Sequence, residues 1–111
     1  MQDSSVIKEI EVSELKQWRD SGKDFELVDV REPNEYDLTH IGGKLIPLGQ
    51  VGERAGEISR EKTVVVMCRS GKRSATAIRE LQEKFGYTNL LNLKGGILAW
   101  AAEIDSSIPR Y

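Results

Sequence analysis

Cysteine and histidine are the scarcest reactive residues of the sequence. Cys68 and His40 are the only examples in 111 residues. One cysteine cannot form a disulfide within the chain, and these two residues do not supply the clustered ligands of a zinc site. We therefore expect no structural metal, and a free thiol that persists in a reducing compartment such as the cytoplasm.

Long apolar runs are missing as well. No stretch of about 18 apolar residues occurs, as a membrane span would require. The first residues, "MQDSSVIKEIEV", also lack a charged leader followed by an apolar segment. We expect a cytoplasmic protein that does not enter a membrane.

Basic residues are not in excess. The net charge is −2, so nothing in the composition indicates a nucleic-acid partner. Only the segment Arg69–Arg73 is locally basic. This leaves a small anionic substrate or an acidic partner open.

The remaining properties are those of one globular domain. Hydrophobic residues make up 39% and charged residues 31% of the chain. Its length supports one core but is too short for two. We predict a single domain over residues 1–111.

Five segments are predicted as strands. They are residues 6–12, 25–30, 45–47, 63–68 and 90–93. The fourth, "TVVVMC", has no alternating polar residues, which is typical of a strand covered on both faces in a parallel sheet.

Helical patterns separate these strands. Ser13 can cap a helix that Gly22 ends, and Pro33 suits the first turn of a short helix. Val51, Ala55 and Ile58 recur at helical spacing between Leu48 and Arg60, although glycines interrupt that segment.

Two further helices are expected near the C-terminus. One has an apolar stripe of Ala75, Ile78, Leu81 and Phe85 and ends at Gly86, and the other is "GGILAWAAEI". Strands that alternate with helices predict an α/β fold, with a central, mostly parallel five-stranded sheet and helices on both faces. Ligands of such sheets gather at the carboxyl ends of the strands, where Cys68 lies.

The segment "VVVMCRSGKRSATAIREL" (residues 64–81) places Cys68 between a strand and a helix. A free thiol is only a few per cent ionised at neutral pH and must lose its proton to act as a nucleophile. Inward-facing amides of the following loop and the charges of Arg69, Lys72 and Arg73 can lower its pKa. Gly71 permits the tight turn, and Ser74 can cap the helix or donate to an anion.

The alternative is that Cys68 is only a small buried hydrophobe, as isolated cysteines often are. Its place at a strand end, the glycine-containing turn and the three cations favour a reactive thiol instead. Trp18 and Trp100 lie on helical stripes and are interpreted as core residues. His40 is left out of the site, because a thiolate with a depressed pKa needs no general base.

Three segments resemble the rhodanese-type sulfurtransferases. "CRSGKRS" is similar to the active-site loop of that family, "LVDVREPNEYDLTHIGGKLIPL" to its upstream signature and "NLKGGILAW" to its closing strand and helix. They occur in the right order over most of the chain. The variant "HIGGKLIPL" resembles the rhodanese domains attached to adenylyltransferases that serve sulfur-carrier proteins.

The resemblance implies a rhodanese-like domain that transfers sulfur in two steps. Cys68 would take the outer sulfur of thiosulfate or a persulfide, and a nucleophilic acceptor would then remove it. No cofactor would be required, because the protein itself carries the sulfur. The loop residues expected to bind the anionic sulfur donor are Arg69, Ser70, Gly71, Lys72, Arg73 and Ser74. Asp29 and Arg31 would support the active loop structurally. The implied partners include a sulfur-carrier protein or a cysteine desulfurase.

Two other functions stay open at this point. Related phosphatases and arsenate reductases use Cys-x5-Arg, but position 74 is serine here, and Arg73 forms a shorter Cys-x4-Arg loop. A non-catalytic interaction module of the same family is the second alternative.

Overall fold

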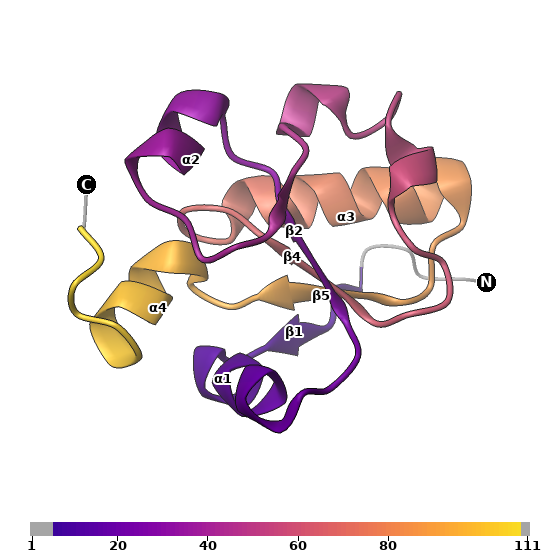
Figure 1. Cartoon of the computed structure of the whole chain (residues 1–111). Helices are drawn as coiled ribbons and strands as arrows, with labels where there is room; N and C mark the ends of the chain where they lie inside the picture. Colours follow the sequence, from indigo (N-terminus) through magenta and orange to yellow (C-terminus); the bar gives the residue numbers. More distant parts are fainter. Residues whose placement is uncertain (1–5, 110–111) are drawn as a thin grey trace.

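Strands and helices alternate along residues 6–109, the part of the chain that the computed structural model describes (Figure 1). The strands are β1 (Glu9–Ile10), β2 (Glu26–Asp29), β3 (Lys44–Leu45), β4 (Val64–Met67) and β5 (Leu90–Leu93). The α-helices are α1 (Val12–Ser21), α2 (Pro33–Leu38), α3 (Lys72–Phe85) and α4 (Gly96–Glu103). The strand order is β1-β5-β4-β2-β3, with parallel pairing throughout. The predicted five-stranded α/β fold is confirmed.

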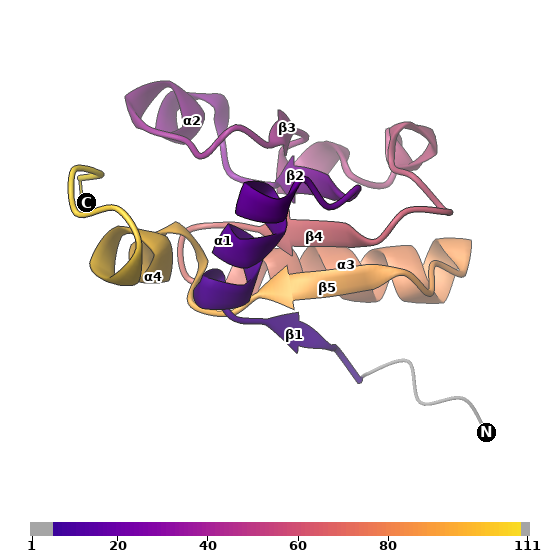
Figure 2. The ribbon, with the colours of Figure 1, turned by 60° about the horizontal axis from the view of Figure 1, so that its bottom comes forward.

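β4 divides the core into two layers because its side chains alternate between the two faces of the sheet. Val64, Val66 and Cys68 belong to the cluster that contains the apolar residues of α3. Val65 and Met67 belong to the cluster that contains those of α1 and α4. Figure 2 shows α1 on one side of the sheet and α3 on the other. The two layers therefore cover both faces of β4, as the uninterrupted apolar pattern of this strand predicted.

The first strand and helix differ from the sequence-based expectation. β1 pairs with β5 over only two residues, and the helix already begins at Val12. Glu11, which has an extended backbone, is the N-cap residue, and no side chain caps this helix. Ser13 therefore lies in the first turn, and its predicted capping role is wrong. Burial of Val12 and Leu15 in one cluster explains the earlier start, since both must face the sheet.

The predicted helix between Leu48 and Arg60 is also wrong. The segment forms two short 3₁₀ helices, Leu48–Gln50 and Ala55–Glu57, joined by turns. Val51, Ala55 and Ile58, which were expected on one face of that helix, are nevertheless buried against the layer of α3. Glycines at every third or fourth position weaken a continuous α-helix, which explains the shorter 3₁₀ helices. The apolar residues still face the core, because their burial does not require an α-helix.

The remaining helix boundaries agree with the sequence. Pro33 is the first residue of α2, where Glu32 and Glu35 form a capping box. Gly22 and Gly86 end α1 and α3 in the left-handed conformation, which glycine adopts without steric strain.

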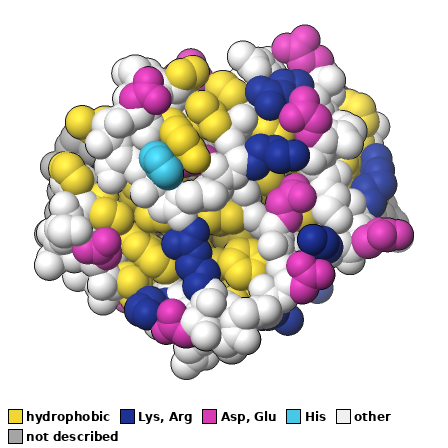
Figure 3. All heavy atoms as spheres, in the orientation of Figure 1, with side chains coloured by type: hydrophobic (Ala, Val, Ile, Leu, Met, Phe, Trp, Pro, Cys, Tyr) yellow, Lys and Arg dark blue, Asp and Glu magenta, His cyan; other side chains and the backbone are white. Residues whose placement is uncertain are grey.

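The helices and one face of the surface bear on possible contacts with membranes and nucleic acid. None of the helices formed by residues 6–109 has the length and apolar character needed to cross a bilayer. On the face drawn in Figure 3, acidic and basic side chains are interspersed without a continuous basic area.

Candidate active site

Cys68 directly follows the central strand β4, and its loop leads into α3. The loop lies at the end of the sheet where α2 and the start of α4 also meet (Figure 1). Gly71 is the N-cap residue of α3 and has a φ of +105°, a conformation that side chains disfavour. The turn brings the first residues of α3 back over the thiol.

Backbone N–H groups of this loop point at the sulfur. Gly71 donates to Cys68 Sγ at 3.0 Å, and Ser74 donates at 3.4 Å. The N–H of Ser70 bonds to the same sulfur, and the Ser74 hydroxyl lies 3.4 Å from it. The loop therefore forms the predicted cradle of inward-facing amides.

The environment of Cys68 makes its thiol more acidic. Burial raises the pKa of Cys68, because a charged thiolate is less stable away from water. In the orientation in which the Ser74 hydroxyl donates to sulfur, this hydrogen bond and those from the N–H groups of Ser74, Gly71 and Ser70 outweigh burial and hold the pKa of Cys68 below its ordinary value. The decrease comes from hydrogen bonds and not from the cations that the sequence places nearby.

Access to the sulfur is narrow. Cys68 is only 1% exposed, whereas Ser70 and Lys72 on the same loop are exposed. Arg69 is half-buried. The thiol thus lies at the bottom of the loop, with polar and basic residues at the rim.

Arg73 connects the loop to α2. Its guanidinium forms a bidentate ion pair with the Glu35 carboxylate, with N–O distances of 2.6 and 2.8 Å. The hydrogen bond from Arg73 lowers the pKa of Glu35 to about 2. A residue predicted to bind the donor is therefore engaged with a neighbouring helix.

Asp29 and Arg31 form a buried ion pair at the end of β2. The Arg31 guanidinium donates to both carboxylate oxygens of Asp29 and to the carbonyl of Thr39, just after α2. Both side chains are fully buried. The pair ties the end of β2 to the end of α2, and Glu35 of α2 in turn contacts Arg73 of the loop. Its support of the Cys68 loop stays a prediction.

The start of α4 supports the other side of the loop. The N–H groups of Ile97 and Leu98 donate to the carbonyl oxygens of Cys68 and Arg69 at 3.0 and 3.1 Å. A Cβ atom on Gly96 would overlap both oxygens, so this close approach requires glycine. The motif "GGILAW" was visible in the sequence, but which groups its glycines approach depends on the packing of α4.

Asn92 on β5 is a residue that sequence reasoning missed. It is buried, accepts a hydrogen bond from the Ser74 hydroxyl at 2.6 Å, and donates to the carbonyl of Gly71 at 3.1 Å. The signal was present in "LLNL", where one amide interrupts an otherwise apolar strand. A buried polar side chain needs partners, and here the active loop provides them.

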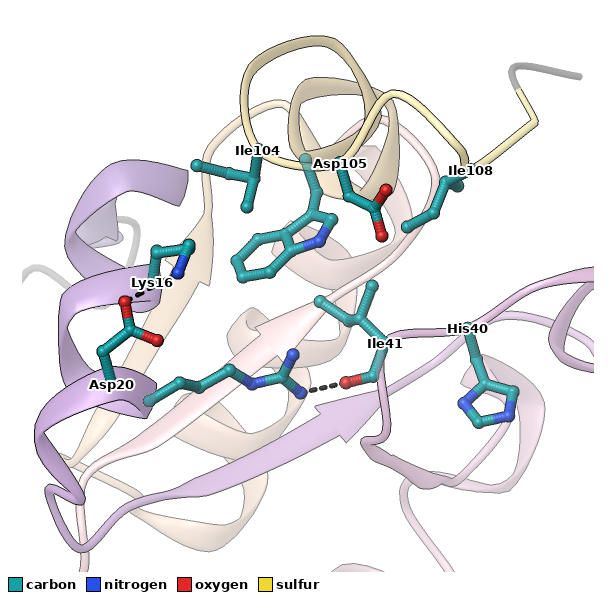
Figure 4. Close-up of a pocket in the computed structure, with 9 residues that line it drawn as sticks. Lys16, Asp20, His40, Ile41, Ile104, Asp105 and Ile108 are labelled. Carbon is teal, nitrogen blue, oxygen red and sulfur yellow. Dashed lines mark hydrogen bonds and ion pairs between the residues drawn. The ribbon is translucent and has the colours of Figure 1, made fainter.

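A cleft of about 420 Å³ lies between α1, the segment after α2, and the end of α4. Figure 4 shows Lys16 and Asp20 of α1 at the left, Ile104, Asp105 and Ile108 along the top, and Ile41 and His40 towards the right. None of the residues that line this cleft belongs to the Cys68 loop. The cleft is therefore separate from the thiol.

The residues excluded from the site occupy structural positions. Trp100 is buried and Trp18 partly buried in the layer of α1 and α4, as predicted. His40 is exposed and stacks on Tyr36 with ring centroids 4.0 Å apart. Within residues 6–109 no group of acidic, cysteine or histidine side chains is arranged to hold a metal ion.

Comparison with known proteins agrees with this geometry. A family profile described as "Rhodanese-like domain" matches residues 11–103. The probable adenylyltransferase/sulfurtransferase MoeZ of Mycobacterium tuberculosis is 39% identical over 101 residues, which cover 88% of this chain but 26% of that protein. The chain thus spans about a quarter of this relative.

Relatives of similar length exist as well. A protein named sulfurtransferase from Allochromatium vinosum is 39% identical over 97 residues, which cover 86% of this chain and 90% of that protein. The crystal structure of a rhodanese-like domain protein from Staphylococcus aureus has a TM-score of 0.78 and 29% identity, and the match covers 85% of this chain and 91% of the other. The first comparison shows similarity in sequence, and the second shows similarity in fold.

Proposed function

Because the chain belongs to the rhodanese-like domain family, we propose that it is a sulfurtransferase that carries sulfane sulfur as a persulfide of Cys68. The observation that carries the proposal is the set of loop N–H groups directed at Sγ. Such groups stabilise a sulfur anion before and after loading, since the persulfide also ends in a negatively charged sulfur.

The loading step begins with the thiolate. Cys68 Sγ attacks the outer sulfur of thiosulfate and forms a new S–S bond. The S–S bond within thiosulfate breaks, and sulfite leaves with its electron pair. In the second step an acceptor nucleophile bonds to the terminal sulfur, and the Cys68 thiolate is regenerated.

The donor has to reach a thiol that is nearly enclosed. Ser70 and Lys72 are the exposed residues of the loop, so we place the entrance between them. Lys72 attracts an anionic donor to this rim, and local opening of residues 69–72 then admits the outer sulfur. Donor binding thus depends on loop motion as well as on charge.

Sulfur chemistry fits this loop better than phosphate chemistry. A Cys-x5-Arg loop requires an arginine at position 74, where Ser74 instead contacts the sulfur. The nearest arginine, Arg73, is paired with Glu35. Both features argue against a phosphatase or an arsenate reductase.

The relative named adenylyltransferase/sulfurtransferase suggests the class of acceptor. Its name joins adenylyl transfer to sulfur transfer. We propose that the physiological acceptor is a sulfur-carrier protein, whose nucleophilic end group reaches the rim at Ser70 and Lys72. A cysteine desulfurase persulfide is the corresponding protein donor.

The test compares the wild type with Cys68→Ser. After incubation with thiosulfate, the wild-type protein should gain the mass of one sulfur atom, and cyanide should remove it as thiocyanate. Cys68→Ser should lose both properties completely while keeping the same circular dichroism spectrum. A wild-type protein that never gains sulfur from thiosulfate, mercaptopyruvate or a desulfurase would instead be a non-catalytic interaction module.

A further inference from the structure

Asn92 closes a ring of hydrogen bonds with the active loop. Its amide nitrogen donates to the Gly71 carbonyl, and its amide oxygen accepts from the Ser74 hydroxyl. Ser74 Oγ lies 3.4 Å from Cys68 Sγ, and the N–H of Gly71 donates to the same sulfur. Asn92, Ser74 and Cys68 are all buried, so water does not replace these partners.

The chemistry of the partners determines the direction of each bond. The carbonyl of Gly71 can only accept, so the amide nitrogen of Asn92 must face it. The amide oxygen then faces Ser74, and because this oxygen also only accepts, the single hydroxyl hydrogen of Ser74 points at Asn92. The side of Ser74 Oγ that faces Cys68 therefore presents a lone pair.

We propose that Asn92 is a positioning residue that keeps the Ser74 hydroxyl turned away from the sulfur and so favours the protonated thiol of Cys68. In this state the S–H of Cys68 donates to Ser74, and Ser74 donates to Asn92. When the thiol ionises, the hydroxyl stabilises the thiolate only if it gives up Asn92, which leaves a buried acceptor without a partner. The thiolate is thus held mainly by backbone N–H groups.

This role rests on the proposed function, because steering the thiol matters only if Cys68 is the nucleophile. The measurement of the Cys68 pKa does not depend on that function, because a thiol ionises whether or not it transfers sulfur. The chain has a single cysteine, so alkylation reports on Cys68 alone. The substitutions used below leave the charged groups near Cys68 unchanged, so these groups do not cause differences in pKa between the variants. They lie on the loop and on the neighbouring ends of β2 and α2, and are Arg69, Lys72, Arg73, Glu35, Asp29 and Arg31.

The experiment is a double-mutant cycle between Asn92 and Ser74. The rate of alkylation by iodoacetamide is measured against pH for the wild type, Asn92→Leu, Ser74→Ala and the double variant, with thiolate absorbance as a second readout. Leucine has nearly the shape of asparagine and suits an apolar strand. Asn92→Ala repeats the measurement with a smaller side chain if the leucine variant does not fold.

Asn92→Leu should lower the pKa of Cys68 by about one unit, because the freed hydroxyl turns to the sulfur. Adding Ser74→Ala should reverse that decrease, whereas Ser74→Ala alone should not raise the pKa of the wild type. An Asn92→Leu pKa at or above the wild-type value would overturn the proposal. So would a Ser74→Ala effect of equal size in both backgrounds, because the hydroxyl would then already donate to sulfur in the presence of Asn92.

Proposed sulfur transfer can fail independently. If the cycle gives the expected pKa values but no persulfide forms, Asn92 still steers Ser74 and only the sulfurtransferase assignment falls. If the persulfide forms but the cycle shows no coupling, the assignment of Asn92 falls and sulfur transfer stands.

Discussion

Gly96 lies where α4 packs against the Cys68 loop, and its lack of a side chain allows this close contact. Any Cβ there would overlap the carbonyl oxygens of Cys68 and Arg69. The residue also has a φ of +57°, which side chains disfavour. Two effects, backbone strain and a direct clash, therefore act on the same position.

Gly96→Ala should destabilise the protein and reduce sulfur loading of Cys68, because the start of α4 must move away from the loop. Gly22→Ala is the matched control, since Gly22 also has a positive φ, of +75°, but a Cβ atom there would meet no other atom within 4 Å. We expect Gly96→Ala to lower the free energy of unfolding by about 1–3 kcal/mol more than Gly22→Ala. Denaturant unfolding measures this difference, and equal losses in the two variants would contradict it.

Some contacts of the Cys68 loop could be predicted from the sequence and others could not. Cys68, Gly71 and Ser74 are close in sequence, so their mutual contacts follow from one strand-to-helix turn. Asn92 and Gly96 come from a later strand and helix and meet the loop only after the sheet has formed. Local patterns indicate that such residues are unusual, but their partners depend on strand order.

Among the elements, α2 is attached to the protein almost entirely by polar contacts. None of its residues is buried. Arg31 holds its carbonyl groups, Tyr36 donates to the carbonyl of Gly43, and Glu35 pairs with Arg73. Because apolar burial contributes little here, the position of α2 beside the active loop depends on charge.

The Glu35–Arg73 pair should make stability depend on pH. The pKa of Glu35 falls from 4.5 to about 2 on folding, so between these values the unfolded chain binds more protons than the folded protein. The contribution of the pair is therefore fully present above pH 4.5 and is lost as the pH falls through about 2. Glu35→Gln should remove this part of the pH dependence.

Urea unfolding between pH 2 and pH 5 measures this dependence. The control is Glu57→Gln, which removes an exposed ion pair with Arg54 that does not touch α2. An exposed pair contributes little to stability. Glu57→Gln should keep the pH dependence that the wild type owes to Glu35. If Glu35→Gln also kept it, the position of α2 would not depend on its ion pair with Arg73.

The central strands could be predicted from the sequence, whereas the segment between Leu48 and Arg60 could not. β2, β4 and β5 have apolar sequences that only a covered sheet explains, and their positions agree with the structure. The segment from Leu48 to Arg60 has the spacing of a helix but too many glycines to form one. There, tertiary burial selected the inward residues while the backbone adopted shorter turns.

At the scale of the whole molecule, one sheet separates two apolar layers, and each layer depends on β4. The Cys68 thiol belongs to the layer of α3, whereas Trp18 and Trp100 belong to the layer of α1 and α4. Tryptophan fluorescence and Cys68 alkylation therefore report on opposite faces of the same sheet. This arrangement predicts that both faces unfold together.

Ile78→Ala tests this coupling, because Ile78 is fully buried in the layer of α3. The substitution should lower the free energy of unfolding by about 2–5 kcal/mol. Although no tryptophan lies in that layer, the fluorescence transition should shift to lower denaturant together with the onset of Cys68 alkylation. Leu15→Ala, in the other layer, should move both transitions in the same way, and separate midpoints in either variant would contradict one cooperative unit.

The solitary thiol has a consequence for how long a loaded sulfur would survive. In many redox proteins a second, resolving cysteine attacks such an intermediate and releases hydrogen sulfide as a disulfide closes. Within these 111 residues Cys68 has no such neighbour. A persulfide on Cys68 therefore cannot be released by disulfide formation within these residues. Its lifetime would depend on reactions with other molecules.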